Sequence, residues 1–251
     1  MIKDGVKMIK CNVLGINYNN VTVGQAADDI YALACSSKGG YVVTPNAEIA
    51  ENYFRDAGLK TAVDDADYVL PDGAGVVLAS KICGNPLSGR ATGVDVSGAL
   101  LGLMSKGGKR LFLLGGKPGI GQKAAENISL KYPGIVIAGV HHGYFKEDSE
   151  VLDEIIAVQP EVLFVAFGSP RQELFMQRNR AAIKAVMLGI GGGIDIFAGE
   201  AKRAPDFFIN HNLEWFYRLI CQPSRIGRMM KLPAYILRAF AWRITGRSKK
   251  Y

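Results

Sequence analysis

The chain has 251 residues, of which 49% are hydrophobic and 21% charged, and its net charge is +7. These values are ordinary for a folded protein of one large or two small domains, and no apolar run approaches the roughly 20 residues that a transmembrane helix needs. The charge is uneven, because residues 201–251 carry +9 and the first 200 residues carry −2. We therefore expect a nearly neutral body with a basic tail.

The four cysteines, Cys11, Cys35, Cys83 and Cys221, are scattered along the chain, without a CxxC motif and without a metal-type spacing to histidine. This distribution is typical of free thiols in a reducing compartment. The first residues do not have the pattern of a signal peptide. We therefore expect the body of the protein to be cytoplasmic.

Short apolar runs alternate with helical patterns over the first 190 residues. The runs predict strands at Val13–Ile16, Tyr41–Thr44, Tyr68–Leu70, Arg110–Leu114, Ile135–Val140, Val162–Ala166 and Ala185–Ile190. Helices are predicted at Thr22–Ser37, Ala47–Ala57, Val94–Lys106, Gly121–Tyr132, Asp148–Gln159 and Arg171–Ile183. This alternation predicts an α/β fold with a mostly parallel sheet and helices on both faces. Ligands of such sheets bind at the carboxyl ends of the strands.

The loops after the second and third predicted strands contain polar side chains. Thr44 and Asn46 follow the second strand, where they either point into a cleft or cap the next helix. Asp72 follows the third strand, in a turn completed by Gly73. A single Asp in a turn usually bonds the local backbone, so the pattern alone favours a structural role for Asp72.

Later strands are followed by glycine-rich or polar turns. Gly115 and Gly116 lie in LLGGKPGIGQKAA (113–125), which resembles a phosphate-binding turn but is neither a Walker loop nor a regular GxGxxG motif. An ordinary tight turn explains it equally well. The next two strands precede FGSPRQE and GIGGGIDIF, which supply Ser169, Arg171, Gln172, Gly191, Gly192 and Asp195. Asp195 either bonds a sugar hydroxyl or caps a turn.

Two further clusters have the residue types of metal ligands. Asp65-Ala66-Asp67 matches the DxD pattern of many glycosyltransferases, but it precedes a predicted strand instead of following one. We interpret it as a solvated helix end. The neighbouring His141 and His142 face opposite sides of a strand, so they form a poor chelating pair. We expect no metal site.

Six segments occur in a distinctive order: TPNAEIA (44–50), YVLPDGAGVV (68–77), SGRATGVDV (88–96), LFLLGGKPG (111–119), FVAFGSPRQE (164–173) and GIGGGIDIFAGEAKRAP (189–205). Together they resemble the WecG/TagA/CpsF glycosyltransferases, from about Val13 to Arg238. The resemblance implies a Rossmann-like core and an inverting, metal-independent enzyme that needs no cofactor. It also implies a homo-oligomer.

The resemblance further implies the substrates. In its teichoic-acid branch, N-acetylmannosamine passes from UDP-N-acetylmannosamine (UDP-ManNAc) to undecaprenyl-diphosphate-linked N-acetylglucosamine (GlcNAc), which gives the β-1,4-linked disaccharide-lipid of the linkage unit. A UDP-N-acetylmannosaminuronic acid or UDP-glucose donor is the alternative within the enzymes. A nucleic-acid-binding module is the alternative of another class, but it explains only the charge of the tail.

Roles for particular residues also follow from the resemblance. It implies that Asp72 is the catalytic base, because the acceptor hydroxyl must lose its proton as it attacks. Thr44, Asn46 and Gln172 match substrate-contacting positions. Four arginines match functional positions, and guanidinium groups suit the growing charge of the leaving UDP: Arg90, Arg218, Arg225 and Arg228.

The tail combines basic and apolar residues. From Arg218 to the end it has nine Lys or Arg and no acid, interleaved with aromatic and aliphatic side chains. Such a segment is typical of a helix that lies on an anionic membrane surface. We therefore predict a catalytic domain over residues 1–205. We expect residues 206–251 to dock on the inner face of the cell membrane and complete the active site.

Overall fold

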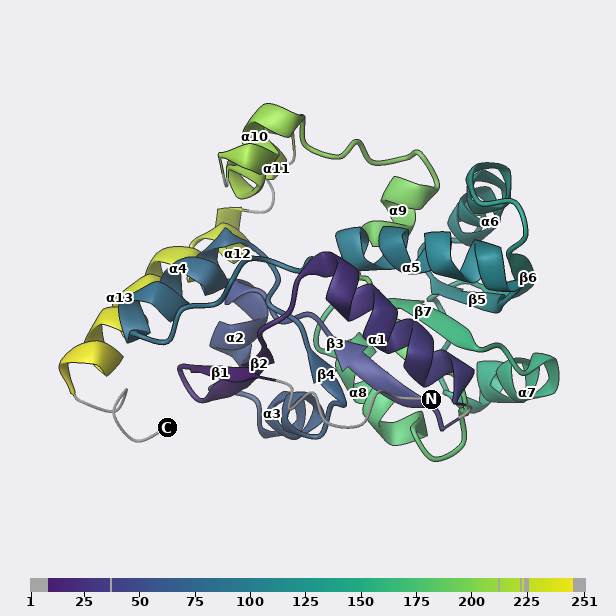
Figure 1. Ribbon diagram of the computed structural model, residues 1–251, viewed down its shortest axis with the longest axis horizontal. Helices are drawn as coiled ribbons and strands as arrows, with labels where there is room; N and C mark the ends of the chain where they lie inside the picture. Colours follow the sequence, from purple (N-terminus) through teal and green to yellow (C-terminus); the bar gives the residue numbers. More distant parts are fainter. Residues whose placement is uncertain (1–8, 37, 212, 222, 224–225, 246–251) are drawn as a thin grey trace.

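The computed structural model describes residues 9–36, 38–211, 213–221, 223 and 226–245. Its centre is a six-stranded sheet in the order β4-β3-β8-β7-β5-β6, and every pairing in it is parallel (Figure 1). The strands are β3 (Gly40–Val43), β4 (Tyr68–Val69), β5 (Arg110–Gly115), β6 (Val136–His141), β7 (Val162–Ala166) and β8 (Val186–Gly189).

Helices pack on both faces of this sheet. One face is covered by α1 (Val23–Cys35), α5 (Gly93–Gly107), α6 (Ile120–Lys131) and the short α9 (Gly193–Phe197). The apolar cluster of the other face includes α2 (Ala47–Tyr53), α3 (Ala57–Asp64), α4 (Ala74–Cys83), α7 (Ser149–Val158) and α8 (Arg171–Asn179). The strands β3, β7 and β8 are buried along their whole length, as expected for a parallel sheet between two helical layers. The predicted α/β fold is confirmed.

The prediction of a strand at Val13–Ile16 is wrong. The structure has an antiparallel hairpin there, formed by β1 (Lys10–Val13) and β2 (Ile16–Asn19). The two turn residues have positive φ angles, 56° at Leu14 and 93° at Gly15. A two-residue turn of this kind matches the twist of the strands it joins.

Two helices on the second face differ from the prediction. The single helix predicted at Ala47–Ala57 ends at Tyr53, and α3 begins at Ala57. Asp56 starts α3, because its side chain accepts a hydrogen bond of 2.9 Å from the N–H of Leu59. The helix α4 was not predicted at all. It packs against both the hairpin and the C-terminal helix, so its apolar residues do not form one clear stripe.

The basic tail forms two parts. The first, α10 (Asp206–Asn210) and α11 (Glu214–Cys221), stands away from the sheet (Figure 1). After α12 (Ile226–Met229), α13 (Lys231–Ile244) packs on α2 and α4 and buries Tyr235 and Ala239 in the core of the body. Among the described residues, no helix has both the length and the apolar character needed to cross a bilayer.

An ion pair fixes α13 on the body. The Nε and Nη2 atoms of Arg238 donate to the buried carboxylate of Glu51 over 2.8 and 3.1 Å. A second contact joins the start of the helix to α2, where the Lys231 ammonium donates to the side chain of Asn52 over 2.9 Å. The helix α13 is therefore an integral part of the folded body.

Candidate active site at the carboxyl edge of the sheet

The structure gathers the predicted loop residues at one edge of the sheet. All six strands are parallel, so the loops that follow them meet at their carboxyl ends. These loops contain Thr44 and Asn46 after β3, Asp72 after β4, Gly115 and Gly116 after β5, Ser169, Arg171 and Gln172 at the end of β7, and Gly191, Gly192 and Asp195 after β8.

Asp72 lies in a tight turn between β4 and α4. Leu70 still pairs with β3, through a hydrogen bond of 2.9 Å from its N–H to the carbonyl of Val43. Gly73 then turns the chain with a φ of +83°, which favours glycine. The carboxylate of Asp72 is partly exposed, and it lies near the buried hydroxyl of Tyr18, whose pKa is raised mainly by burial and further by Tyr235 and Asp72.

Thr44 and Asn46 both contribute to the local structure. The buried hydroxyl of Thr44 donates to the carbonyl of Gly189 over 3.3 Å and so links β3 to β8. The side-chain oxygen of Asn46 accepts a hydrogen bond of 3.0 Å from the N–H of Ile49 and caps α2. Capping is thus one role of Asn46, while its predicted contact with substrate stays a prediction.

Gln172 connects the start of α8 to the loop after β8. Its buried side chain accepts a hydrogen bond of 3.1 Å from the N–H of Gly191. The amide nitrogen donates to Oε1 of Glu173 over 2.9 Å. The amide oxygen and the amide nitrogen of Gln172 therefore both form hydrogen bonds with other groups of the protein.

A cleft of about 620 Å³ opens at the ends of β5, β6, β7 and β8. It lies where the loops after β5 and β7 leave toward opposite faces, since α6 and α8 belong to different helical layers. Three cationic side chains contribute to its lining, those of Lys117, Lys146 and Arg171, together with the carboxylate of Asp195. The other lining residues are Gly116, Gly143, Tyr144, Phe145, Ala166 and Phe167.

The glycine-rich turn after β5 lines this cleft through Gly116 and Lys117. Gly115 has a φ of +137°, and a Cβ atom on it would lie 2.4 Å from the carbonyl oxygen of Ala166. Only glycine fits between the two strands at this point. The turn leads into the first turn of α6, whose N-cap residue is Gly119. No side chain caps this helix start, and helix starts of this kind commonly bind anions.

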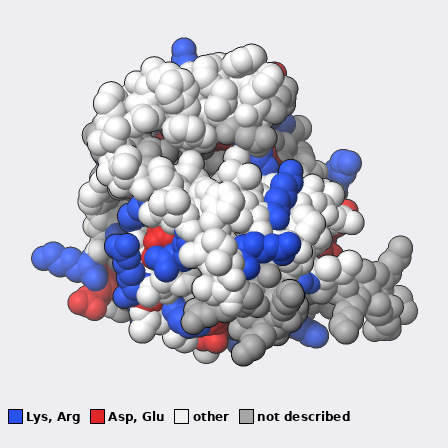
Figure 2. Space-filling view, turned by 90° about the vertical axis from the view of Figure 1, so that its left-hand side faces the viewer, with Lys and Arg blue, Asp and Glu red and all other residues white. Residues whose placement is uncertain are grey.

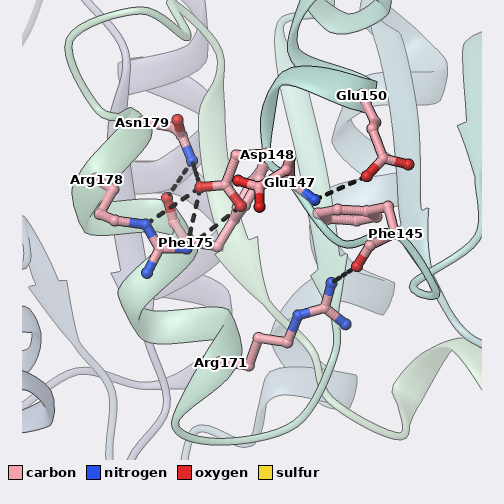
Figure 3. Close-up of polar contacts among 8 residues, drawn as sticks. All are labelled: Phe145, Glu147, Asp148, Glu150, Arg171, Phe175, Arg178 and Asn179. Atoms are coloured by element: carbon pink, nitrogen blue, oxygen red, sulfur yellow. Dashed lines mark hydrogen bonds and ion pairs between the residues drawn. The ribbon is translucent and has the colours of Figure 1, made fainter.

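Arg171 holds one wall of the cleft. Its guanidinium donates to the carbonyls of Gly143 and Phe145, the latter over 3.0 Å. It also lies 4.5 Å from the ring centroid of Phe145 and 4.6 Å from that of Phe167. Figure 3 shows Arg171 reaching from α8 toward the loop that follows β6. The predicted contact of Arg171 with substrate stays a prediction.

The far end of the same loop is fixed by α8 as well. The side chain of Asp148 accepts hydrogen bonds from Arg178, at 3.0 Å, and from Asn179, at 2.8 Å (Figure 3). Residues 143–148 are thus attached to α8 at both ends. These contacts hold the loop that contributes Tyr144 and Lys146 to the lining of the cleft.

Arg90 links the body to the projecting part of the tail. Its Nη2 donates to the carbonyl of Ile209 over 3.2 Å, and its Nη1 pairs with Oε2 of Glu214 over 3.4 Å. Arg225 lies outside the described residues, as do the side chains of Arg218 and Arg228.

Asp65 and Asp67 precede β4 and therefore lie at the amino ends of the strands, opposite the candidate site. Asp67 accepts hydrogen bonds from the N–H of Tyr41, at 2.9 Å, and from Arg180, at 2.8 Å. Asp65 accepts one of 2.9 Å from Gln177. Asp67 therefore links β3 to the residue after α8, and Asp65 links the end of α3 to α8. Neither carboxylate lines the cleft.

Several residues that line the cleft were not predicted. Lys117 lies within the glycine-rich turn, Tyr144, Phe145 and Lys146 lie in the loop after β6, and Phe167 directly follows β7. The signal for them was their place directly after an apolar strand, since every such loop reaches the same edge of a parallel sheet.

Comparisons with known proteins agree with the motifs. A model of the Glycosyl transferase WecG/TagA/CpsF family matches residues 11–249. The N-acetylglucosaminyldiphosphoundecaprenol N-acetyl-beta-D-mannosaminyltransferase of Bacillus subtilis (strain 168) is 42% identical over 200 residues, which cover 79% of this chain and 78% of the relative. The protein of the same name from Staphylococcus aureus (strain MRSA252) is 32% identical over 231 residues, covering 90% of this chain and 91% of the relative. The chain belongs to the WecG/TagA/CpsF family of glycosyltransferases.

Proposed function

We propose that the protein transfers N-acetylmannosamine from UDP-ManNAc to undecaprenyl-diphosphate-linked GlcNAc, with a β-1,4 linkage, as in the teichoic-acid linkage unit. The names of its relatives describe, for those proteins, the transfer of an N-acetyl-beta-D-mannosaminyl group to N-acetylglucosaminyldiphosphoundecaprenol. The observation that carries the proposal for this chain is the presence of Asp72 and a basic cleft at the same edge of one parallel sheet.

The cleft is suited to the nucleotide of the donor. Lys117, Lys146 and the first N–H groups of α6 provide positive potential for a diphosphate. The carboxylate of Asp195 can accept hydrogen bonds from sugar hydroxyls. With UDP in this cleft, the donor sugar extends along the edge, past Thr44 and the loop at Gly191, toward Asp72.

Asp72 then acts on the acceptor. Its carboxylate takes the proton of the GlcNAc hydroxyl as that oxygen attacks the anomeric carbon from the side opposite UDP, which inverts the configuration. Negative charge grows on the departing UDP during this step. Arg90 and the arginines of the tail neutralise it, so we propose a reaction without a metal ion. The distant positions and existing hydrogen bonds of Asp65 and Asp67 support this view.

The tail places the enzyme on the membrane that holds the lipid acceptor. Large apolar side chains of this segment are exposed to solvent: Phe207, Trp215, Phe216, Ile220, Ile226, Met230, Leu237, Phe240 and Ile244. Figure 2 shows this end of the molecule, where Lys and Arg side chains gather beneath a nearly uncharged upper part. A surface with apolar side chains and flanking cations binds anionic lipid headgroups.

The proposal is tested by a donor screen with the full chain and a short-chain lipid-diphosphate-GlcNAc acceptor. Each UDP-sugar is supplied in turn, with and without EDTA, and the product mass is measured. We expect one added N-acetylhexosamine from UDP-ManNAc, and equal rates with EDTA. Transfer only from UDP-N-acetylmannosaminuronic acid or UDP-glucose would contradict the proposed donor, and a loss of turnover with EDTA would contradict the metal-free mechanism.

A further inference from the structure

Glu173 is a buried acid beside the candidate site that the proposed mechanism does not use. It follows Gln172 in the first turn of α8 and is 0% exposed. Its Oε1 accepts the hydrogen bond from the amide nitrogen of Gln172. Its Oε2 and the hydroxyl of Ser169 are both buried, and neither forms a hydrogen bond within the described part of the chain.

The contacts of Gln172 require one orientation of its amide group. The N–H of Gly191 needs an acceptor, so the oxygen of Gln172 must face the loop after β8. The amide nitrogen must then face the other way, where it needs an acceptor as well. Oε1 of Glu173 provides it. Without that acceptor, a buried N–H group of Gln172 would have no hydrogen-bond partner. The free-energy cost of such an unpaired buried donor is larger than the net stabilisation that the hydrogen bond provides.

The same amide is packed tightly against β8. A Cβ atom on Gly189 would lie 2.9 Å from the amide nitrogen of Gln172, so the strand approaches this side chain closely. The carbonyl of Gly189 in turn accepts the hydroxyl of Thr44. Gln172 therefore touches the backbone on both sides of the turn that leads from β8 to the cleft.

The surroundings of Glu173 favour the neutral form of its side chain. Burial raises its pKa above the ordinary value of 4.5, and the hydrogen bond from Gln172 opposes only part of this effect. A protonated carboxyl group keeps one acceptor oxygen for Gln172 and gains one O–H donor on the side of Ser169. A glutamine at the same position has the same acceptor and donor.

We propose that Glu173 is a positioning residue of the transfer reaction, which orients the amide of Gln172 and thereby holds the loop at Gly191 in the shape that receives the UDP-sugar. This inference rests on the proposed function, since it assigns the loop to the donor. Glu173 does not line the cleft and is not itself a proton donor or acceptor for the substrate.

Two substitutions distinguish the effect of the hydrogen-bond acceptor at position 173 from the effect of its negative charge. Glu173→Gln keeps the acceptor for Gln172 but cannot ionise, whereas Glu173→Asp keeps the acid but shortens the side chain and withdraws the acceptor. We measure the affinity for UDP by calorimetry, and KM and kcat for the donor. We expect Glu173→Gln to stay within about threefold of the wild type, and Glu173→Asp to weaken UDP binding and raise the donor KM by about tenfold, the cost of one unpaired buried donor.

Hydrogen exchange of the Gly191 amide gives a readout that does not depend on turnover. It should be faster in Glu173→Asp and unchanged in Glu173→Gln. Leu174→Ala is the matched control, because Leu174 lies on the same helix but faces Gly58 of α3. It should lower the melting temperature without changing UDP affinity.

The outcomes are distinguishable from a failure of the proposed function. Wild-type protein that neither binds UDP nor transfers N-acetylmannosamine would refute the function itself. UDP binding that is normal in the wild type and equally normal in Glu173→Asp would overturn the role of Glu173. Loss of binding in Glu173→Gln would also overturn it, because the charge and not the position of the group would then matter.

Discussion

The carboxylate of Asp72 is partly exposed because the backbone turns away directly after this residue. The turn at Gly73 directs the chain into α4 directly after the carboxylate, and the side chain stays partly exposed at the edge that also contains the cleft. If Asp72 is the base, Asp72→Asn should lower kcat by about a hundredfold or more, because an amide cannot accept the proton of the attacking hydroxyl. UDP affinity and the melting temperature should change little.

The control for this substitution is Asp65→Asn. Asp65 belongs to the DxD pattern but lies at the opposite edge, where it bonds Gln177. It should retain nearly full turnover. Wild-type-like turnover in Asp72→Asn would remove Asp72 from the mechanism, and a large loss in Asp65→Asn together with metal dependence would restore the DxD pattern as a metal site.

Between elements, the contact of Arg90 with α10 and α11 joins two parts of the chain that are over 100 residues apart in sequence. The side chains of Arg90 and Glu214 are each only 17% exposed, so their ion pair is partly protected from solvent. Glu214→Ala should therefore loosen α10 and α11, accelerate their proteolysis, and raise the KM for the lipid acceptor severalfold. UDP affinity should stay the same.

A surface ion pair provides the comparison. Lys123 and Glu200 pair with side chains that are 59% and 45% exposed, and such pairs contribute little to stability. Glu200→Ala should change neither proteolysis nor acceptor KM. Equal results for Glu214→Ala and Glu200→Ala would show that the contact with Arg90 does not position the tail.

The elements also show what the sequence could predict. The alternation of apolar runs and helical patterns predicted every strand of the main sheet, because strands between two helical layers consist largely of apolar residues. It missed the turn at Leu14, where an apolar residue adopts a positive φ, and it missed α4, whose partners lie on several sides. These features depend on tertiary packing, which no local pattern contains.

The sequence predicted the location of the candidate site but only some of the contacts that its residues make. The rule that loops meet at the carboxyl edge predicted the place of Asp72 and Gly191, and the family motifs supplied their proposed roles. The capping role of Asn46 was one of two roles expected from the sequence, whereas the loop support by Arg171 and Gln172 was visible only in three dimensions. A sequence motif identifies which residue matters, but the hydrogen-bond partners of that residue come from segments that are distant in the sequence.

At the scale of the whole molecule, the uneven charge of the chain corresponds to two different surfaces. The nearly neutral body contains the cleft. The basic tail lies at one end of the molecule (Figure 1) and has exposed apolar side chains. Removal of the whole tail is a poor test of membrane docking, because α13 buries Tyr235 and Ala239 in the body. Single substitutions on the exposed side of the tail keep this core intact.

Ile220 on α11 and Leu237 on α13 are suitable positions, since they are 57% and 69% exposed. Replacing either with Glu removes an apolar anchor and adds a charge that anionic headgroups repel, so binding to phosphatidylglycerol vesicles should fall by about tenfold or more. Leu130→Glu is the matched control, because Leu130 is 82% exposed on α6, far from the tail (Figure 1). Vesicle binding of the wild type should also weaken with salt. Equal binding by all three variants would contradict docking through the tail, and unchanged binding in high salt would contradict the contribution of its cations.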